Sequence, residues 1–196
     1  ATMLKAIGLE PPKNIFAHGW WTVNGQKMSK SLHNVVEPNQ LVDQFGVDVI
    51  RYFLLREVPF GLDGDFSHKA LIRRLNSDLA NNLGNLLNRT VNMMKKYFNG
   101  TIPEPATTGE EDTVLQNKSQ EVIDEMRKLY DELAFNKILQ KIWDLVDTTN
   151  QYIDKTGPWN LVKTDEGKER LKTVMYNAAE SIRVLGILLF PFMPKS

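Results

Sequence analysis

The chain has 196 residues and a mass of 22.4 kDa, enough for one medium-sized domain or for one domain with part of another. Hydrophobic residues make up 42% and charged residues 24%, which excludes a mostly disordered chain. The 24 basic and 24 acidic residues cancel, which excludes a uniformly basic nucleic-acid-binding protein. Because cysteine is absent, disulfides, thiol catalysis and Cys-ligated zinc are excluded as well.

Nothing in the sequence suggests a metal site or a membrane protein. Only three His are present, and they are scattered, so we expect no metal site. The longest apolar run, residues 184–193, is shorter than a membrane span, and the first residues do not resemble a signal peptide. We therefore expect a cytoplasmic protein with neither a membrane nor DNA as partner. The chain lacks an initiator Met and stops abruptly at Ser196, so we expect a fragment of a longer protein.

The first predicted element is a hairpin. An aromatic-rich apolar stretch leads to Trp20 and Trp21, and the strand through Val23 meets Asn24-Gly25, the strongest short hairpin signal. We expect a strand, a tight turn, and a short strand or loop up to Lys27. Trp20 and Trp21 are expected in the strand or the core, and Trp143 in the core.

Two short helices are predicted next. Pro38 begins the first, which ends at Gly46. The second runs from Asp48 to Glu57, and residues 60–65 are expected to form a loop.

A long helix is predicted from Ser67, a plausible N-cap, to Phe98, because Asn99-Gly100 ends it. At 100° per residue one face is apolar and the other polar. The apolar face is predicted to carry Ile72, Leu79, Leu83, Leu87, Thr90, Met94 and Tyr97, and the polar face Asp78, Asn81, Asn85, Arg89, Asn92 and Lys96.

Three further amphipathic helices are predicted, at residues 110–129, 133–153 and 165–189, with Gly157-Pro158 separating the last two. The predicted fold class is therefore mainly α. A helical bundle over residues 61–196 follows a small α/β piece over residues 1–60 that holds the strand, the hairpin and the two short helices.

The most informative stretch is Lys27-Met28-Ser29-Lys30-Ser31. Two lysines three residues apart, with hydroxyl groups beside them, suit phosphate oxygens, because Lys is a compact charge on a flexible stem. A loop of this kind can close over a polyphosphate and stabilise the charge that develops on a leaving pyrophosphate. As chemistry alone the pattern is weak, since two lysines at this spacing occur by chance on many surfaces.

As a string of residues, this loop resembles the signature loop of class I aminoacyl-tRNA synthetases. The resemblance implies that Lys27 and Lys30 are catalytic and contact ATP phosphates, and that Met28, Ser29 and Ser31 complete the ATP-binding loop. It also implies that His18 and Gly19, on the preceding strand, lie near the nucleotide, although His18 fits a packed strand residue slightly better. Residues 1–60 would then be the tail of the catalytic domain, and the two short helices a connector that packs against the inner stem of the tRNA.

The predicted bundle is similar to the anticodon-binding domain of the methionyl-tRNA synthetases. In that family an Asn and an Arg four residues apart contact anticodon bases, and these positions match Asn85 and Arg89. The spacing places both side chains on one helix face. The family also has a Trp after a Pro that stacks on the first base of the CAU anticodon, and Pro158-Trp159 matches it. Taken singly, Asn85 and Arg89 fit ordinary surface residues and Trp159 fits a lid on the bundle, but together they favour anticodon binding.

The resemblance implies an enzyme, a methionine-tRNA ligase in its intact form. That enzyme activates methionine with ATP and Mg²⁺ and transfers it to tRNA(Met). Its partners would be ATP, methionine and the anticodon stem-loop. The first nucleotide signature of the catalytic domain, the methionine pocket and the zinc-bearing insert of the family are absent from the sequence. We therefore expect this chain alone to be inactive in aminoacylation.

Two alternatives remain open on sequence alone. One is a fragment of another class I synthetase, of the leucine, valine, isoleucine or cysteine type, which shares the loop and a helical bundle. The other is a non-catalytic RNA-binding helical module whose loop lysines contact the phosphate backbone.

Overall fold

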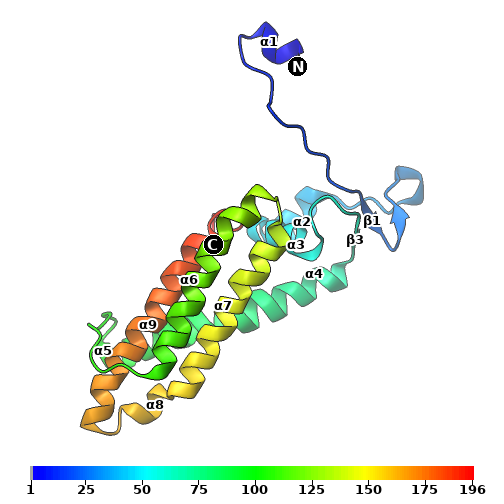
Figure 1. Cartoon of the computed structure of the whole chain (residues 1–196). Coiled ribbons are helices and arrows are strands. Elements are labelled where there is room, and N and C mark those ends of the chain that lie inside the picture. The colour runs from blue at the N-terminus through cyan, green and yellow to red at the C-terminus, as the bar shows by residue number, and fades with distance from the viewer. Residues whose placement is uncertain (1) are drawn as a thin grey trace.

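The structure, a computed structural model, describes residues 2–196 and consists of a helical bundle with a smaller sheet-containing part at one end (Figure 1). An N-terminal arm, made of α1 (Thr2–Ala6) and the irregular segment 7–20, extends away from both parts. No helix within residues 2–196 is long and apolar enough to cross a membrane.

A three-stranded sheet lies at the end of the arm. Strands β1 (Trp21–Val23) and β2 (Gln26–Lys27) form the predicted hairpin, and Asn24 and Gly25 at its turn have φ values of 53° and 72°. These are the positive values that a two-residue turn of this type requires. The third strand, β3 (Gly64–Phe66), pairs in parallel with β1. The prediction of a loop over residues 60–65 was therefore wrong at its end, since a strand of three residues carries almost no periodic signal.

The two tryptophans near the start of the hairpin differ in burial, and only Trp21 lies in β1. Trp21 packs against Phe53 with ring centroids 5.9 Å apart. Trp20 is 70% exposed, so its predicted place in the strand or core was wrong. The third tryptophan of that prediction, Trp143, is buried as expected.

Two helices pack on the sheet. Helix α2 (Pro38–Phe45) has the predicted bounds, with Pro38 in its first turn, and α3 (Val47–Glu57) begins one residue earlier than expected. Strand β3 and the helix that follows it, α4 (His68–Arg74), complete a small apolar core with α2 and α3. Its buried members are Leu41, Ile50, Phe53, Phe66 and Leu71.

The predicted long helix is continuous but not uniform. It consists of α4 (His68–Arg74), a π-helical segment η2 (Leu75–Gly84) and α5 (Asn85–Phe98). Ser67 caps its start by accepting a hydrogen bond from the backbone N–H of Ala70 at 3.0 Å, as predicted. Asn99, in the left-handed region, ends it.

The predicted apolar face of this helix is confirmed in part. Thr90 and Met94 are buried as predicted. Ile72 and Leu87, predicted on the same face, are 45% and 47% exposed, whereas their neighbours Leu71 and Leu86 are fully buried.

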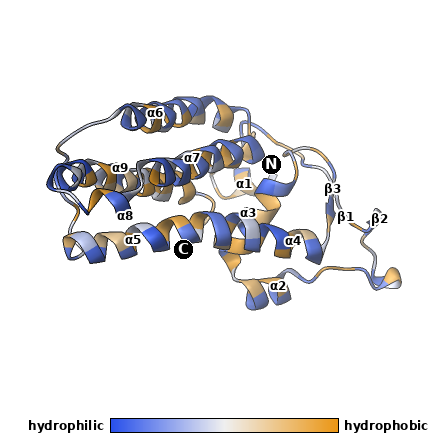
Figure 2. Cartoon of the chain, turned by 90° about the horizontal axis from the view of Figure 1, so that it is seen from below, coloured by the Kyte–Doolittle hydropathy of each residue, from blue (hydrophilic) through white to orange (hydrophobic). Residues whose placement is uncertain are grey.

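The bundle is completed by α6 (Glu110–Asp131), α7 (Phe135–Thr156), the one-turn α8 (Pro158–Leu161) and α9 (Asp165–Leu189). Helices α6, α7 and α9 run side by side in Figure 1, and hydrophobic and hydrophilic residues alternate along each helix in Figure 2, as amphipathic helices require. Helix α7 is the central one and contributes more buried residues to the main core than any other helix. Its buried apolar residues are Ile138, Leu139, Ile142, Trp143, Leu145, Val146, Tyr152 and Ile153.

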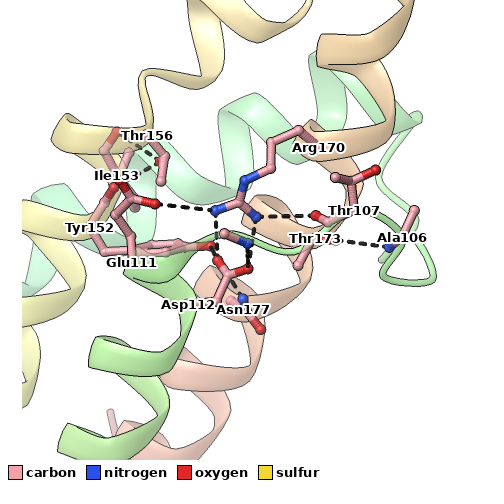
Figure 3. A network of polar contacts seen from close by, with 11 residues as sticks. Ala106, Thr107, Glu111, Asp112, Tyr152, Ile153, Thr156, Arg170, Thr173 and Asn177 are labelled. Carbon is pink, nitrogen blue, oxygen red and sulfur yellow. Dashed lines mark hydrogen bonds and ion pairs between the residues drawn. The ribbon is translucent and has the colours of Figure 1, made fainter.

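A buried polar network joins α6, α7 and α9 (Figure 3). Asp112, only 3% exposed, accepts two hydrogen bonds from the Arg170 guanidinium at 2.9 and 2.8 Å and one from the Tyr152 hydroxyl at 2.6 Å. Burial acts to raise the pKa of Asp112, but bonds from Arg170, Tyr152 and the Gly109 N–H outweigh it, so the pKa lies below its ordinary value. The carboxylate therefore stays ionised and holds three helices together.

A second polar cluster ties α3 to the bundle. The Tyr52 hydroxyl donates to Asp78 of η2 at 2.7 Å, and the Tyr52 ring lies 4.7 Å from that of Trp143 on α7. Arg74 bridges the same Asp78 at 3.1 Å and Glu57 of α3 at 2.7 Å. Burial, followed by the bond to Asp78, raises the pKa of Tyr52 far above its ordinary value, so the phenol keeps its proton.

The segment after α9 also returns to α3. Arg51 donates to the backbone carbonyls of Pro191 at 2.7 Å and Phe192 at 2.9 Å. Asp48, at the start of α3, accepts a bond from the N–H of Lys195 at 2.8 Å. The small part and the bundle are thus joined at several points.

Candidate functional site

The polar face of α5 carries two of the predicted anticodon-binding residues. Asn85 begins the helix and is exposed, and its side-chain N–H₂ donates to the Asn81 carbonyl at 2.8 Å. This bond leaves the side-chain oxygen of Asn85 as an available acceptor. Arg89, one turn later, reaches across to α7, where its Nη1 binds Asp154 at 2.7 Å and its Nη2 donates to the Asn150 carbonyl at 2.7 Å.

The third predicted residue, Trp159, lies in α8 and not in an open loop. Gly157, with φ of 53°, ends α7 in the left-handed conformation, and Pro158 begins the single turn of α8. Pro158 is buried while Trp159 is 47% exposed. Its indole is therefore not a lid sealed beneath its neighbours, and part of its surface is open to solvent.

The contacts of Arg89 and the position of Trp159 both lie near the C-terminal end of α7. The two contacts of Arg89 fall at residues 150 and 154, in the last two turns of the helix, and Trp159 follows only five positions after Asp154. The arrangement thus places a guanidinium and an indole beside one helix end, with the Asn85 amide one turn before Arg89. Asn150 and Asp154 were not predicted, because no local pattern on α7 reveals a contact with a helix some sixty residues earlier.

The lysine loop lies in the small part, far along the chain from α5. Lys27 ends β2, and its ammonium sits 5.2 Å from the centroid of the exposed Trp20 ring. Met28 is half-buried against the small core, so it anchors the loop, as expected. Lys30 begins a short 3₁₀ turn, η1 (Lys30–Leu32), and is exposed.

Hydrogen bonds between near neighbours shape this loop. Asn34 accepts from the backbone N–H of Ser29 at 2.8 Å and donates to the Lys27 carbonyl at 3.2 Å. The hydroxyls of Ser29 and Ser31 are 2.6 Å apart. Asn34 was missed by the sequence analysis, although an amide a few residues beyond a loop is a typical partner for its backbone.

The turn of the hairpin before the loop is held by an acidic residue that the sequence analysis also missed. Asp65 of β3 accepts from the Gly25 N–H at 2.8 Å and from the Thr22 hydroxyl at 2.7 Å. The backbone bond from Gly25 and then the bond from Thr22 lower the pKa of Asp65 below its ordinary value. An ionised Asp65 thus supports the turn that leads into Lys27.

His18 and Gly19 precede this strand. His18 is exposed and lies outside β1, so its interpretation as a packed strand residue was wrong. Its Nδ1 lies 2.7 Å from the Gly19 carbonyl oxygen, and its ring is 5.9 Å from that of Phe60. Gly19 passes so close to the next segment that a Cβ there would lie 2.3 Å from the backbone of Leu62. A glycine is therefore required at this position for packing, whatever its place near a nucleotide.

No three His, Asp or Glu side chains within residues 2–196 are grouped so that they could hold a metal ion. The functional groups of the two candidate sites are instead lysines and hydroxyls in the loop, and an amide, a guanidinium and an indole in the bundle. The first set is suited to phosphate oxygens and the second to unpaired bases.

Comparison with known proteins identifies the family of the chain. Residues 1–91 match the family model described as tRNA synthetases class I (M), and residues 102–196 match the anticodon binding domain of methionyl tRNA ligase. A methionine–tRNA ligase of Caldanaerobacter subterraneus subsp. tengcongensis is 55% identical over 99% of the chain, and one of Clostridium tetani is 48% identical over the same share. In both cases the chain spans 30% of the relative's length.

A solved structure, methionyl-tRNA synthetase of Mycobacterium tuberculosis in complex with methionyl-adenylate, superposes with a TM-score of 0.90 at 39% identity, covering 99% of this chain and 38% of that one. The predicted mainly α fold with a small sheet is confirmed by this likeness. The matches also decide against the leucine, valine, isoleucine and cysteine enzymes, since both family models describe the methionine enzyme. The chain therefore belongs to the methionyl-tRNA synthetase family of class I aminoacyl-tRNA synthetases.

Proposed function

We propose that this chain is the part of a methionyl-tRNA synthetase that reads the CAU anticodon of tRNA(Met) and supplies the loop that holds the phosphates of ATP. One observation carries the proposal. Arg89 is bound to the last turns of α7, and the half-exposed Trp159 follows directly from the end of that helix.

The three bundle residues offer what an unpaired anticodon needs. A partly exposed indole is a stacking surface for one base. Arg89 provides a planar set of donors, and the free oxygen of Asn85 provides an acceptor, so base edges can be read by hydrogen bonds. The ion pair between Asp154 and the Arg89 guanidinium would hold the guanidinium in place when no RNA is bound.

The loop residues would act on ATP. Lys27 and Lys30 would hold its phosphates, with Ser29 and Ser31 as hydroxyl donors, while His18 and Gly19 would lie beside the nucleotide. The Mg²⁺ that ATP carries would neutralise phosphate charge. The loop has no carboxylate, so its donor set fits the phosphate oxygens and not the metal ion.

In the reaction of the intact enzyme, the methionine carboxylate attacks the α-phosphate of ATP, giving methionyl-adenylate and pyrophosphate, and a terminal hydroxyl of the tRNA then takes the methionyl group. In this proposal residues 1–60 serve the first step and residues 61–196 select the tRNA, in the cytoplasm. Because the chain spans 30% of its relatives, the remainder of the catalytic site must come from sequence outside it. The chain alone would therefore be inactive in methionine-dependent ATP–pyrophosphate exchange.

The test is binding of a CAU anticodon stem-loop, compared with a stem-loop changed at its first anticodon base, at one fixed salt concentration. Trp159→Ala is expected to weaken CAU binding about 5- to 150-fold, the value of one stacked base, and Arg89→Ala to reduce the preference for CAU. Trp20→Ala is the matched control, because it removes an indole that is even more exposed, 70% against 47% for Trp159, and lies outside the bundle.

Equal binding of the two stem-loops by the unmodified chain would contradict the proposed anticodon reading. It would indicate instead a module with general phosphate affinity, whose binding falls steeply with salt.

A further inference from the structure

The proposed anticodon reader is divided between two helices. Asn85 and Arg89 lie on α5, whereas Trp159 follows α7, so the separation between the amide and the indole depends on how far one helix is displaced along the other. Apolar contacts between the helices, such as those of Leu79, Leu83 and Leu86 with the main core, favour burial but are not directional. Something else must fix the register.

Asn82, in the π-helical segment η2, makes two side-chain hydrogen bonds to α7. Its Nδ2 donates to Asp147 at 2.6 Å, and its Oδ1 accepts from the side-chain N–H₂ of Asn150 at 2.7 Å. Residues 147 and 150 are one turn apart on α7, so the single amide of Asn82 spans that turn. The bond to Asp147 is exposed, whereas the bond from Asn150 is partly buried, so water weakens the second bond less than the first.

Asn150 connects this contact to the reader. Its side chain binds Asn82, while its backbone carbonyl accepts the bond from Arg89 at 2.7 Å. The helix formed by η2 and α5 is thus attached to α7 at two levels, first by Asn82 and seven residues later by Arg89. Hydrogen bonds at two positions along the helix axis oppose both sliding and rotation of one helix against the other.

We propose that Asn82 is a positioning residue of the anticodon reader, which sets the register of α5 against α7 and so the distance from Asn85 and Arg89 to Trp159. This inference rests on the proposed function. The amide of Asn82 donates to the Asp147 carboxylate through its nitrogen and accepts from the Asn150 amide through its oxygen. Leucine would do neither, and aspartate would place a second carboxylate against Asp147.

The test measures binding of the CAU stem-loop and of the stem-loop changed at its first anticodon base. It also measures the melting temperature, and both measurements are made for the unmodified chain and for Asn82→Leu. We expect the preference for CAU to fall about tenfold, the value of two lost hydrogen bonds. Asn76→Leu is the matched control, because Asn76 lies in the same segment and is exposed. It should keep the full preference.

A swap separates positioning from simple stability. Asn82→Asp should lose CAU preference, and adding Asp147→Asn should restore the pair with donor and acceptor exchanged. The preference of the double variant should then exceed, by threefold or more, the value expected from adding the two single effects. This cycle decides the question even if Asn82→Leu fails to fold.

Retained CAU preference in Asn82→Leu, or additive effects in the swap, would overturn the role of Asn82 and leave the proposed function intact. If the unmodified chain shows no preference for CAU, the proposed function itself is overturned, and the role of Asn82 with it.

Discussion

The two candidate sites are held in opposite ways. In the bundle, Arg89 is fixed by bonds to a helix sixty residues later in the sequence, and that helix is in turn held by the buried Asp112 network. In the small part, the lysine loop is shaped by Asn34 and by paired serines, all within eight residues of Lys27. Reading bases requires fixed geometry, whereas closing on a phosphate chain requires a loop that can move.

Among the variants that test this contrast, Arg170→Ala is expected to have the largest effect. The change leaves the Asp112 carboxylate buried with its charge uncompensated, which should cost about 3–5 kcal/mol of unfolding free energy. Thermal or denaturant unfolding measures the loss, and CAU preference should weaken as the helices loosen. The control is Arg183→Ala, whose partner Glu180 lies on the exposed surface. It should change stability by under about 1 kcal/mol, and equal losses in the two variants would contradict the structural role of Asp112.

The next test concerns the loop. In the intact enzyme, Lys30→Ala should slow methionine activation about 100-fold, because a charge that stabilises the leaving pyrophosphate is lost, while CAU preference remains. Pyrophosphate exchange and stem-loop binding measure the two effects. Lys13→Ala, an exposed lysine on the arm, serves as the control. An unchanged activation rate would remove Lys30 from the mechanism, and a lost CAU preference would show that the sites are not independently held.

The smallest expected effect is one of pH on the hairpin turn. Because the pKa of Asp65 is lower in the folded turn than in the unfolded chain, its contribution is fully present above the ordinary pKa and is lost as pH falls through the folded value. The Gly25 amide resonance should therefore titrate with a midpoint below 3.8, the ordinary value. Asp65→Asn should abolish that titration while the bundle resonances stay unchanged. A midpoint at or above the ordinary value would contradict the bond between Asp65 and Gly25.

Sequence patterns predicted those parts of the fold that depend on neighbours along the chain. The hairpin at Asn24-Gly25, helix α2 and helix α9 have the expected bounds, because turn residues, Pro at a helix start and helical periodicity are local signals. Strand β3 was missed because its three residues form a strand only by pairing with β1, some forty residues earlier.

The site was predictable only in part. The Asn85, Arg89 and Trp159 positions came from a family resemblance supported by helix spacing. Their partners did not, since the bond from Arg89 to Asp154 and those from Asn82 to α7 join segments far apart in sequence. The π-helical segment was not predicted either, because its apolar residues keep the spacing of an α-helix, although Asn, Ser, Asp and Gly make up six of its ten residues.

The attachment of α3 to the bundle has a mechanical consequence. Tyr52 is bound to η2, its ring lies against Trp143 of α7, and Arg51 holds the backbone beyond α9. A helix gripped on three sides cannot pivot, so α3 and the bundle form one stiff lever. The sheet that carries the lysine loop is tied to this lever at two points, through the small core that it shares with α3 and α4 and through β3, which leads directly into α4.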